Sequence, residues 1–389
     1  MRQLFAFCIL ILSVMQVEAS SSKDIVEEMV SIADIKINGD RPWDIQVNDE
    51  RFYNRVLKDR SLGFGESYME NAWDAEALDV CIYRILMADL EHNFKPTWPH
   101  VWAYLKAKLF NRQNRSGSIQ VINQHYQLGN DLYQNMLDPL MTYSCGYWKN
   151  AKNLTEAQVA KYDLIARKLG FKKGMRILDI GCGWGGFAKY ASEQYGVDVV
   201  AITLSENQAV YAKEVCKDLS VEIRVQDYRD LNEKFDRIIE IGMFEHVGAK
   251  NYRIFMEIVH RCLNDNGMVM LHTIGGNQSK ITGDPWVDKY IFRGGQLPSI
   301  AQIGTSIEGL FIMEDWHNFS VDYDKTLMAW FHNFDNNWDK IKQNYPLHFY
   351  RMWKYYLLSC AGAFRARDIQ LWQVVLSKGG VLGGYETVR

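Results

Sequence analysis

The sequence lacks the features that mark several common classes of protein. Its 389 residues have a formal net charge of only −3, so bulk positive charge gives no indication of nucleic-acid binding. Its seven cysteines are scattered, odd in number and never spaced as C-x-x-C. That pattern argues against a disulfide framework and a zinc site, and it favours a reducing compartment. We find no internal repeat, and no apolar run reaches the roughly 20 residues that a transmembrane helix needs.

The first 20 residues give conflicting signals. A basic start at Arg2, an apolar run over residues 4–15 and a small-residue exit at Ala19 and Ser20 resemble a secretory signal. The cofactor inferred below is cytosolic, so we favour a membrane-proximal extension or an upstream start codon over a cleaved signal. We expect a cytoplasmic protein that associates peripherally with the inner face of the cell membrane.

Residues 21–110 have a mostly helical pattern with few strand signals. Apolar residues recur at helical spacing over residues 24–35 until Gly39–Pro42 breaks the pattern. Helical spacing returns at 54–57 and 67–90. We therefore expect a small, mostly helical N-terminal domain.

The segment 94–115 is the most informative part of this region. Trp98, Trp102, Leu105 and Leu109 fall on one face of a helix, and five basic residues but no acidic one accompany them. Such a helix can lie on an anionic bilayer, or it can pack against a core with a solvated basic side. The pattern alone does not decide between the two. We predict a lipid- or membrane-binding domain over 21–110 and a polar linker over 111–119.

From about residue 120 the pattern becomes α/β, and we assign residues 120–389 to one catalytic domain. Helical segments separate most of the buried strands, as in a doubly wound, Rossmann-like parallel sheet. The predicted strands are Arg176–Ile180, Val197–Leu204, Val221–Gln226, Phe235–Ile241 and Gly267–Ile274, with Phe311–Trp316 and Trp372–Leu376 to finish the sheet.

A glycine-rich loop at 178–186 follows the first of these strands and opens a helix. It has the form G-x-G-x-G-G, and Asp179 precedes it. Glycines at such a turn let the backbone pass close to a ligand. This variant resembles the loop of methyltransferases, whose ligand, S-adenosylmethionine, has an amino-acid tail and no phosphate. The loop residues that we expect to bind the cofactor are Asp179, Gly181, Cys182, Gly183 and Gly185.

The ends of the next two strands supply further candidates. Thr203 and Gln208 lie where the ribose should sit, about 20 residues beyond the loop. Asp227 can accept a hydrogen bond from the adenine amino group, and Tyr228 can stack on the ring. Solvated polar residues at strand ends are the alternative explanation for all four.

Seven motifs together resemble cyclopropane-fatty-acyl-phospholipid synthases, a family of mycolic acid cyclopropane synthase-like methyltransferases. The resemblance runs from about residue 21 to about residue 376, and residues 1–20 depart from it. The motifs are Tyr143–Trp148, Leu178–Gly186, Gly242–Gly248, Leu271–Gly275, Met313–Phe319, Asp322–Tyr323 and Cys360–Asp368.

The resemblance implies a reaction on the cis double bond of an unsaturated phospholipid in a bilayer. The alkene attacks the methyl group of S-adenosylmethionine, a carbocation forms, and a base removes a proton from the transferred methyl so that a cyclopropane ring closes. S-adenosylhomocysteine is the other product. The family also suggests a homodimer, and its motifs assign Tyr143 and Ser144 to the cofactor.

The resemblance also implies that the base is a bound bicarbonate ion. Its ligands, carried over by motif, are Cys145, Glu245, His272, the backbone of Ile274, and Tyr323. An ionised Glu245 can accept a hydrogen bond from the bicarbonate hydroxyl, which would orient the ion and raise its basicity. Without the family match, an ordinary core role would be the favoured interpretation of Cys145 and His272, with a functional role as the alternative.

The chemistry makes two further demands. The alkene and the methyl group must be held in line at about 3–3.5 Å, in a site that excludes water. Aromatic faces stabilise a cation by about 0.5–2 kcal/mol each. The aromatic candidates are Tyr143, Tyr147, Trp148, Phe244, Trp316, Phe319 and Tyr323.

Cys360 is a separate candidate from the last of these motifs. A thiolate beside a sulfonium would risk being alkylated, so we expect Cys360 to line the pocket, with a catalytic role as the alternative. Two other functions stay open. One is a lipid C-methyltransferase with a methyl-branched product, and the other is a non-catalytic lipid-binding protein.

Overall fold

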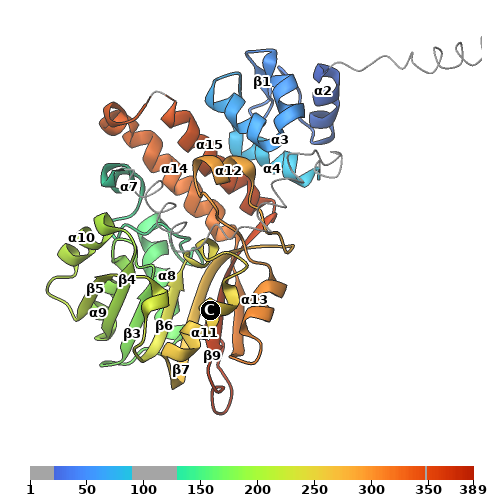
Figure 1. The fold of residues 1–389 in the computed structure, drawn as a ribbon. Coiled ribbons are helices and arrows are strands. Elements are labelled where there is room, and N and C mark those ends of the chain that lie inside the picture. The colour runs from blue at the N-terminus through green and yellow to red at the C-terminus, as the bar shows by residue number, and fades with distance from the viewer. Residues whose placement is uncertain (1–21, 90–128, 347) are drawn as a thin grey trace, which may run out of the picture.

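The computed structural model describes residues 22–89, 129–346 and 348–389. The signal-like residues 1–20, the predicted helix over 94–115 and the predicted linker over 111–119 lie outside these ranges. Within them, a seven-stranded sheet organises the C-terminal part of the molecule (Figure 1).

The sheet has the order β5-β4-β3-β6-β7-β9-β8, and only β9 runs against the others. All seven predicted strands are present, and the Rossmann-like α/β fold is confirmed. The strands are β3 (Arg176–Ile180), β4 (Asp198–Thr203), β5 (Val221–Val225), β6 (Phe235–Ile241), β7 (Leu263–Gly276), β8 (Ile312–Asn318) and β9 (Ile369–Ser377).

Helices bury both faces of the sheet. Successive residues of a strand point to opposite faces, so Ile177 joins the apolar cluster beneath α9 while Leu178 joins the cluster beneath α11. The helices that cover the sheet are α8 (Leu154–Lys168), α9 (Gly186–Tyr195), α10 (Glu206–Val215), α11 (Tyr252–Cys262) and α13 (Ile300–Ile307).

The N-terminal part is mostly helical, as predicted. It contains α2 (Ser22–Ile32), α3 (Arg51–Met69) and α4 (Leu78–Met87), with a small antiparallel pair of β1 (Gln46–Val47) and β2 (Trp73–Asp74). The prediction of continuous helix over 67–90 was wrong. Asn71 adopts a left-handed conformation with φ 59°, which ends the helix, and the chain then pairs with β1.

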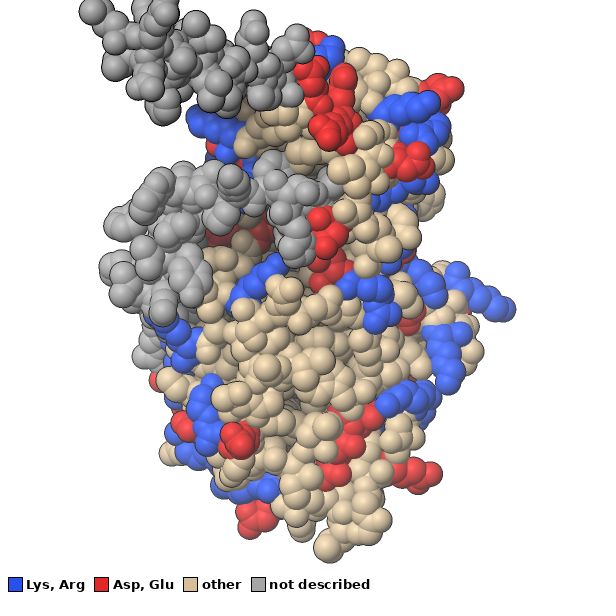
Figure 2. Space-filling model, turned by 90° about the vertical axis from the view of Figure 1, so that its right-hand side faces the viewer, with Lys and Arg blue, Asp and Glu red and all other residues tan. Residues whose placement is uncertain are grey.

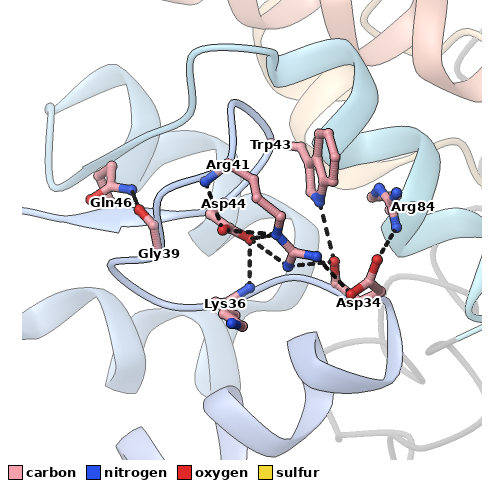
Figure 3. Close-up of polar contacts among 8 residues, drawn as sticks. All are labelled: Asp34, Lys36, Gly39, Arg41, Trp43, Asp44, Gln46 and Arg84. Atoms are coloured by element: carbon pink, nitrogen blue, oxygen red, sulfur yellow. Dashed lines mark hydrogen bonds and ion pairs between the residues drawn. The ribbon is translucent and has the colours of Figure 1, made fainter.

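A buried carboxylate holds the connection between α2 and β1 (Figure 3). Asp44 is 1% exposed and accepts hydrogen bonds from the Arg41 guanidinium at 2.8–3.2 Å. Asp34 binds both Arg41 and Arg84, each at 2.7 Å, and Arg84 lies over the Trp43 ring. Ion pairs therefore fix the segment where Gly39–Pro42 breaks the helical pattern.

Two long helices, α14 (Val321–Ile341) and α15 (Phe349–Arg365), lie between the N-terminal part and the sheet (Figure 1). Shorter helices, α7 (Asn130–Met136) and α12 (Pro285–Tyr290), complete this layer. Arg351 of α15 joins the two parts: it donates to the carbonyls of Tyr68 and Trp73 at 2.6 and 3.0 Å and to Asp74 at 2.8 Å. Its guanidinium also lies 4.0 Å from the centre of the Tyr68 ring.

We predict that Arg351→Leu lowers the free energy of unfolding by about 2–4 kcal/mol, because it removes three hydrogen bonds to partly buried acceptors, two carbonyls and the Asp74 carboxylate. Urea unfolding followed by tryptophan fluorescence measures the change. Lys354→Leu is the matched control on the same helix, since Lys354 lies over the Phe331 ring and should change stability little. Equal loss in the two variants would contradict the role of Arg351.

Candidate active site

The glycine-rich loop between β3 and α9 lies at the carboxyl edge of the parallel strands, where α/β folds place their sites. Gly181 has φ 82°, and a Cβ there would stand 2.9 Å from the Cβ of Met243. Gly185 has φ 83°, and its Cβ would press against Ala212 at 3.0 Å. Only glycine therefore fits at position 181, which lies against Met243, and at position 185, which packs against α10.

A cavity opens above this loop. Nine of the eleven predicted cofactor residues line it: Tyr143, Ser144, Asp179, Gly181, Cys182, Gly183, Thr203, Gln208 and Tyr228. The other two do not. Gly185 packs behind the loop, and the carboxylate of Asp227 binds the Arg229 guanidinium at 2.6 and 2.8 Å instead of facing the cavity.

The end of the cavity lined by Thr203 and Gln208 is held by hydrogen bonds within one turn. Thr203 Oγ1 lies 3.0 Å from Gln208 Oε1 and accepts from the backbone of Ser205 at 3.1 Å. Sequence reasoning missed Gln226, which precedes Asp227 and lines the cavity in its place. It also missed His246, whose pKa burial lowers to about 4, so that its ring is neutral.

A second group of residues, which we call the polar cluster, comprises Cys145, Glu245, His272, Ile274 and Tyr323. Glu245 lies on the short helix η3 (Phe244–His246) after β6, and its Oε1 accepts from the Ile274 amide of β7 at 2.6 Å. Burial raises the pKa of Glu245 to about 7, while the Ile274 amide lowers it. The Ile274 N–H thus holds Glu245.

His272 of β7 is buried and uncharged. Burial lowers its pKa well below the ordinary histidine value. Gln373 of β9, directly opposite in the sheet, places its Nε2 3.3 Å from His272 Nδ1. With that amide donating to Nδ1, the single ring proton lies on Nε2. Sequence reasoning missed Gln373, because strand pairing alone brings it to His272.

Two buried atoms of the polar cluster have no hydrogen-bond partner among the described residues: Glu245 Oε2 and His272 Nε2. Native proteins seldom leave such atoms unpaired, since each costs roughly 1–3 kcal/mol. An unpaired acceptor and an unpaired donor are the two groups that a small anion with one hydroxyl would need. The donor set therefore fits bicarbonate.

Cys145 and Tyr323 complete the polar cluster. Burial raises the pKa of Tyr323 well above its usual value, and the neighbouring Cys145 thiol and Glu245 carboxyl raise it further. Burial likewise raises the pKa of Cys145, which stays a thiol and lies 3.9 Å from Thr326 Oγ1. The Tyr323 ring stacks on Phe364, with 4.4 Å between ring centres.

Cys360 lies on α15 beside this cluster, among Tyr323, Tyr355 and Tyr356. Burial raises its pKa to about 12, so it is a thiol and a poor nucleophile at neutral pH. This protonation state agrees with a lining role.

The aromatic candidates fall into two groups. Phe244 and Trp316 belong to the core beneath α11 and do not line the cavity, and their contact with a cation stays a prediction. Tyr143 does face the site: it lines the cavity, packs on Trp330 at 5.1 Å between ring centres and shares a 2.8 Å hydrogen bond with the Tyr356 hydroxyl. Trp330 was not predicted, because the sequence around it shows only helical spacing.

Comparison with known proteins agrees with this geometry. Residues 113–374 match the family model described as mycolic acid cyclopropane synthetase. The chain is 52% identical over 355 residues to the cyclopropane-fatty-acyl-phospholipid synthase of Escherichia coli K12, covering 91% of this chain and 93% of that protein. The chain therefore belongs to the family of mycolic acid cyclopropane synthetases.

Solved structures support the same assignment. A cyclopropane synthase of Mycobacterium tuberculosis matches with a TM-score of 0.64 and 32% identity, over 67% of this chain and 98% of that one. A mycolic acid cyclopropane synthase complexed with SAH and CTAB matches with a TM-score of 0.63 and 34% identity, over 67% of this chain and 98% of that one. The chain is thus an S-adenosylmethionine-dependent methyltransferase of the cyclopropane synthase family.

Proposed function

We propose that this enzyme transfers a methylene group from S-adenosylmethionine to the cis double bond of an unsaturated phospholipid acyl chain, with bound bicarbonate as the base. The alkene carbon bonds to the methyl group as the carbon–sulfur bond breaks, and S-adenosylhomocysteine leaves. The transferred methyl then loses one proton to the base. The electron pair of the broken C–H bond attacks the carbocation and closes the cyclopropane ring. The unpaired Glu245 Oε2 and His272 Nε2, next to a family-typical cofactor cavity, are the observation that carries the proposal.

The side chains suit this chemistry in three ways. Tyr143 and Tyr323, with Trp330 packed on both, present aromatic faces to a developing cation. The thiols of Cys145 and Cys360 are protonated, so neither competes for the methyl group. Bicarbonate, when bound, supplies a weakly nucleophilic base, which Glu245 and His272 would hold by accepting from its hydroxyl and donating to its oxygen.

Two alternatives fit the observations less well. The chain is also 35% identical to a probable fatty acid methyltransferase of Pseudomonas putida, over 67% of this chain and 69% of that protein. A methyl-branched chain forms when the carbocation loses a proton from an acyl carbon instead of from the transferred methyl, and the lower identity to this methyltransferase, 35% against 52%, favours ring closure. A non-catalytic lipid-binding protein leaves both the cavity and the polar cluster without a role.

One assay separates these functions. The purified protein is incubated with bicarbonate, vesicles of cis-unsaturated phospholipid and S-adenosylmethionine whose methyl group is fully deuterated. Ring closure predicts a saturated acyl chain with one added carbon that keeps two of the three deuterium atoms. Retention of all three deuterium atoms would show a methyl branch instead, and no incorporation at all would remove both enzymatic functions.

Glu245 makes the rate depend on pH. Burial raises the pKa of Glu245 to about 7, so the ionised form that accepts the bicarbonate hydroxyl dominates above pH 7 and is lost below it. We predict that turnover at a fixed bicarbonate concentration rises as pH increases through this value. Glu245→Gln should lower turnover by about tenfold to hundredfold and remove this step, because the amide does not titrate.

The control for this prediction is Glu308→Gln, a change of an exposed carboxyl at the end of α13 that should keep the wild-type pH profile. Affinity for S-adenosylhomocysteine should be unchanged in both variants. The same pH step in Glu245→Gln would assign the titration to another group.

We also propose that the enzyme works as a homodimer at the surface of the cytoplasmic membrane, on its inner face. None of the described helices is long and apolar enough to cross a bilayer. Figure 2 shows basic and acidic side chains interspersed on one face of the described residues, without a broad surface of one sign. The predicted helix over 94–115, which lies outside the described residues, is our candidate for bilayer contact because of its aromatic face and its basic residues.

We predict that Trp98→Ala combined with Trp102→Ala weakens binding to anionic phospholipid vesicles, since both indoles lie on the apolar face of the predicted helix. Vesicle sedimentation measures this loss, and calorimetry with S-adenosylhomocysteine should show unchanged cofactor affinity. Unchanged vesicle binding would contradict the membrane role of this segment.

A further inference from the structure

Two fully buried polar side chains of α8 reach the segment that forms one wall of the cofactor cavity. Gln158 and Lys161 are both 0% exposed. Gln158 Nε2 donates to the Ser144 carbonyl at 2.8 Å, and Lys161 Nζ donates to Ser144 Oγ at 2.7 Å. Ser144 itself lines the cavity. Neither α8 residue belongs to a motif that indicated function.

The Lys161 contact fixes the direction of the Ser144 hydroxyl. An ammonium group has three donors and no acceptor, so Ser144 Oγ must accept from it. The hydroxyl proton of Ser144 is then free to point into the cavity. A hydroxyl that accepts from a cation and donates to an anion forms a charge-assisted chain that is stronger than either neutral bond alone.

The strand order places the amino-acid tail of the cofactor at this wall. Tyr228 follows β5, and Thr203 ends the neighbouring β4, so adenine and ribose occupy that end of the cavity. The rest of the cofactor extends past β3, to Asp179 and Ser144. Asp179 Oδ2 is buried without a hydrogen-bond partner among the described residues, and it suits the ammonium group of the tail.

The charges around Lys161 favour the binding of one more negative group. Burial lowers the pKa of Lys161 to about 7, while the nearby Asp138, Cys145 and Asp179 raise it. Burial also raises the pKa of Asp138, and it raises that of Asp179 to about 7, so burial disfavours the charged form of both acids near the ammonium. A ligand carboxylate would compensate the ammonium and favour the charged lysine.

We propose that Lys161 is a positioning residue for the carboxylate of S-adenosylmethionine: it turns the Ser144 hydroxyl into the cavity and provides the buried positive charge opposite the carboxylate. Gln158 supports it by holding the Ser144 backbone. This inference rests on S-adenosylmethionine being the co-substrate, and it adds the group that recognises its tail.

The test compares two ligands that differ in the tail. S-adenosylhomocysteine has the amino-acid tail, and methylthioadenosine has the same nucleoside without it. We expect Lys161→Met to weaken S-adenosylhomocysteine binding by about tenfold or more, the effect of losing one charge-assisted hydrogen bond, and to leave methylthioadenosine binding unchanged. Calorimetry measures both dissociation constants without any turnover.

Lys168→Met is the matched control. Lys168 is a second buried lysine on α8, and burial lowers its pKa to about 7 as well, but its Nζ lies 3.1 Å from His317 and 3.5 Å from Asp315. The Lys168→Met variant should bind S-adenosylhomocysteine and methylthioadenosine as tightly as the wild type does. Equal weakening of both ligands by Lys161→Met, or the same discrimination in Lys168→Met, would overturn the proposal.

Ser144→Ala gives a second measurement that does not depend on how Lys161→Met folds. Ser144→Ala should show the same loss of affinity for S-adenosylhomocysteine and no loss for methylthioadenosine. An unchanged affinity for S-adenosylhomocysteine would overturn the proposal. If the wild-type protein binds neither ligand, the co-substrate assignment fails first, and this inference fails with it.

Discussion

Residues 142–148 have no regular secondary structure, and hydrogen bonds from two helices fix their backbone, mostly through side chains. Gln158 and Lys161 of α8 hold Ser144 on one side. On the other side, Thr326 and Asp322 of α14 accept from the amides of Gly146 and Trp148 at 3.1 and 2.8 Å. This double attachment places Ser144 in the cofactor cavity and the next residue, Cys145, in the polar cluster. The spacing between the cofactor cavity and the polar cluster therefore depends on one short, tightly held segment.

Burial decides the protonation of the groups around this segment. His272 is neutral because burial, and then the charges of Lys161 and Lys168, disfavour an imidazolium. Burial likewise keeps the thiols of Cys145 and Cys360 protonated. Burial and the charge of Glu245 raise the pKa of Glu240 well above the usual value, although Glu240 accepts from the Phe244 amide at 2.8 Å. Of the two carboxyls, Glu245 is therefore the one that ionises. A site of this kind offers a dry, weakly nucleophilic surface with a single adjustable charge, as carbocation chemistry requires.

Much of the fold followed from local pattern, and the errors have physical causes. Apolar runs of five to seven residues predict the buried strands, because both faces of a parallel sheet are covered. The glycine loop is equally local. The core position of Phe244 could not be predicted, because a motif fixes the position of a residue along the chain but not the face on which its side chain lies. Gln373 and Lys161 carry no local signal, since strand pairing with β7 and packing of α8 bring them to their partners.

The packing also changes how the N-terminal part relates to the chemistry. The sequence suggested a separate lipid-binding domain, but one continuous apolar core extends from Val26 and Trp73 to Cys145 and Tyr323. A close-packed protein core transmits small displacements, because it has few voids that could absorb them. Arg351, which holds α15 to Tyr68 and Trp73, lies on the helix that also carries Cys360 and Phe364, the ring under Tyr323. A lipid bound by the N-terminal part would contact the same apolar core as α15, the helix that lies beside the polar cluster. Lipid binding there would therefore affect the position of the residues that have to align the alkene.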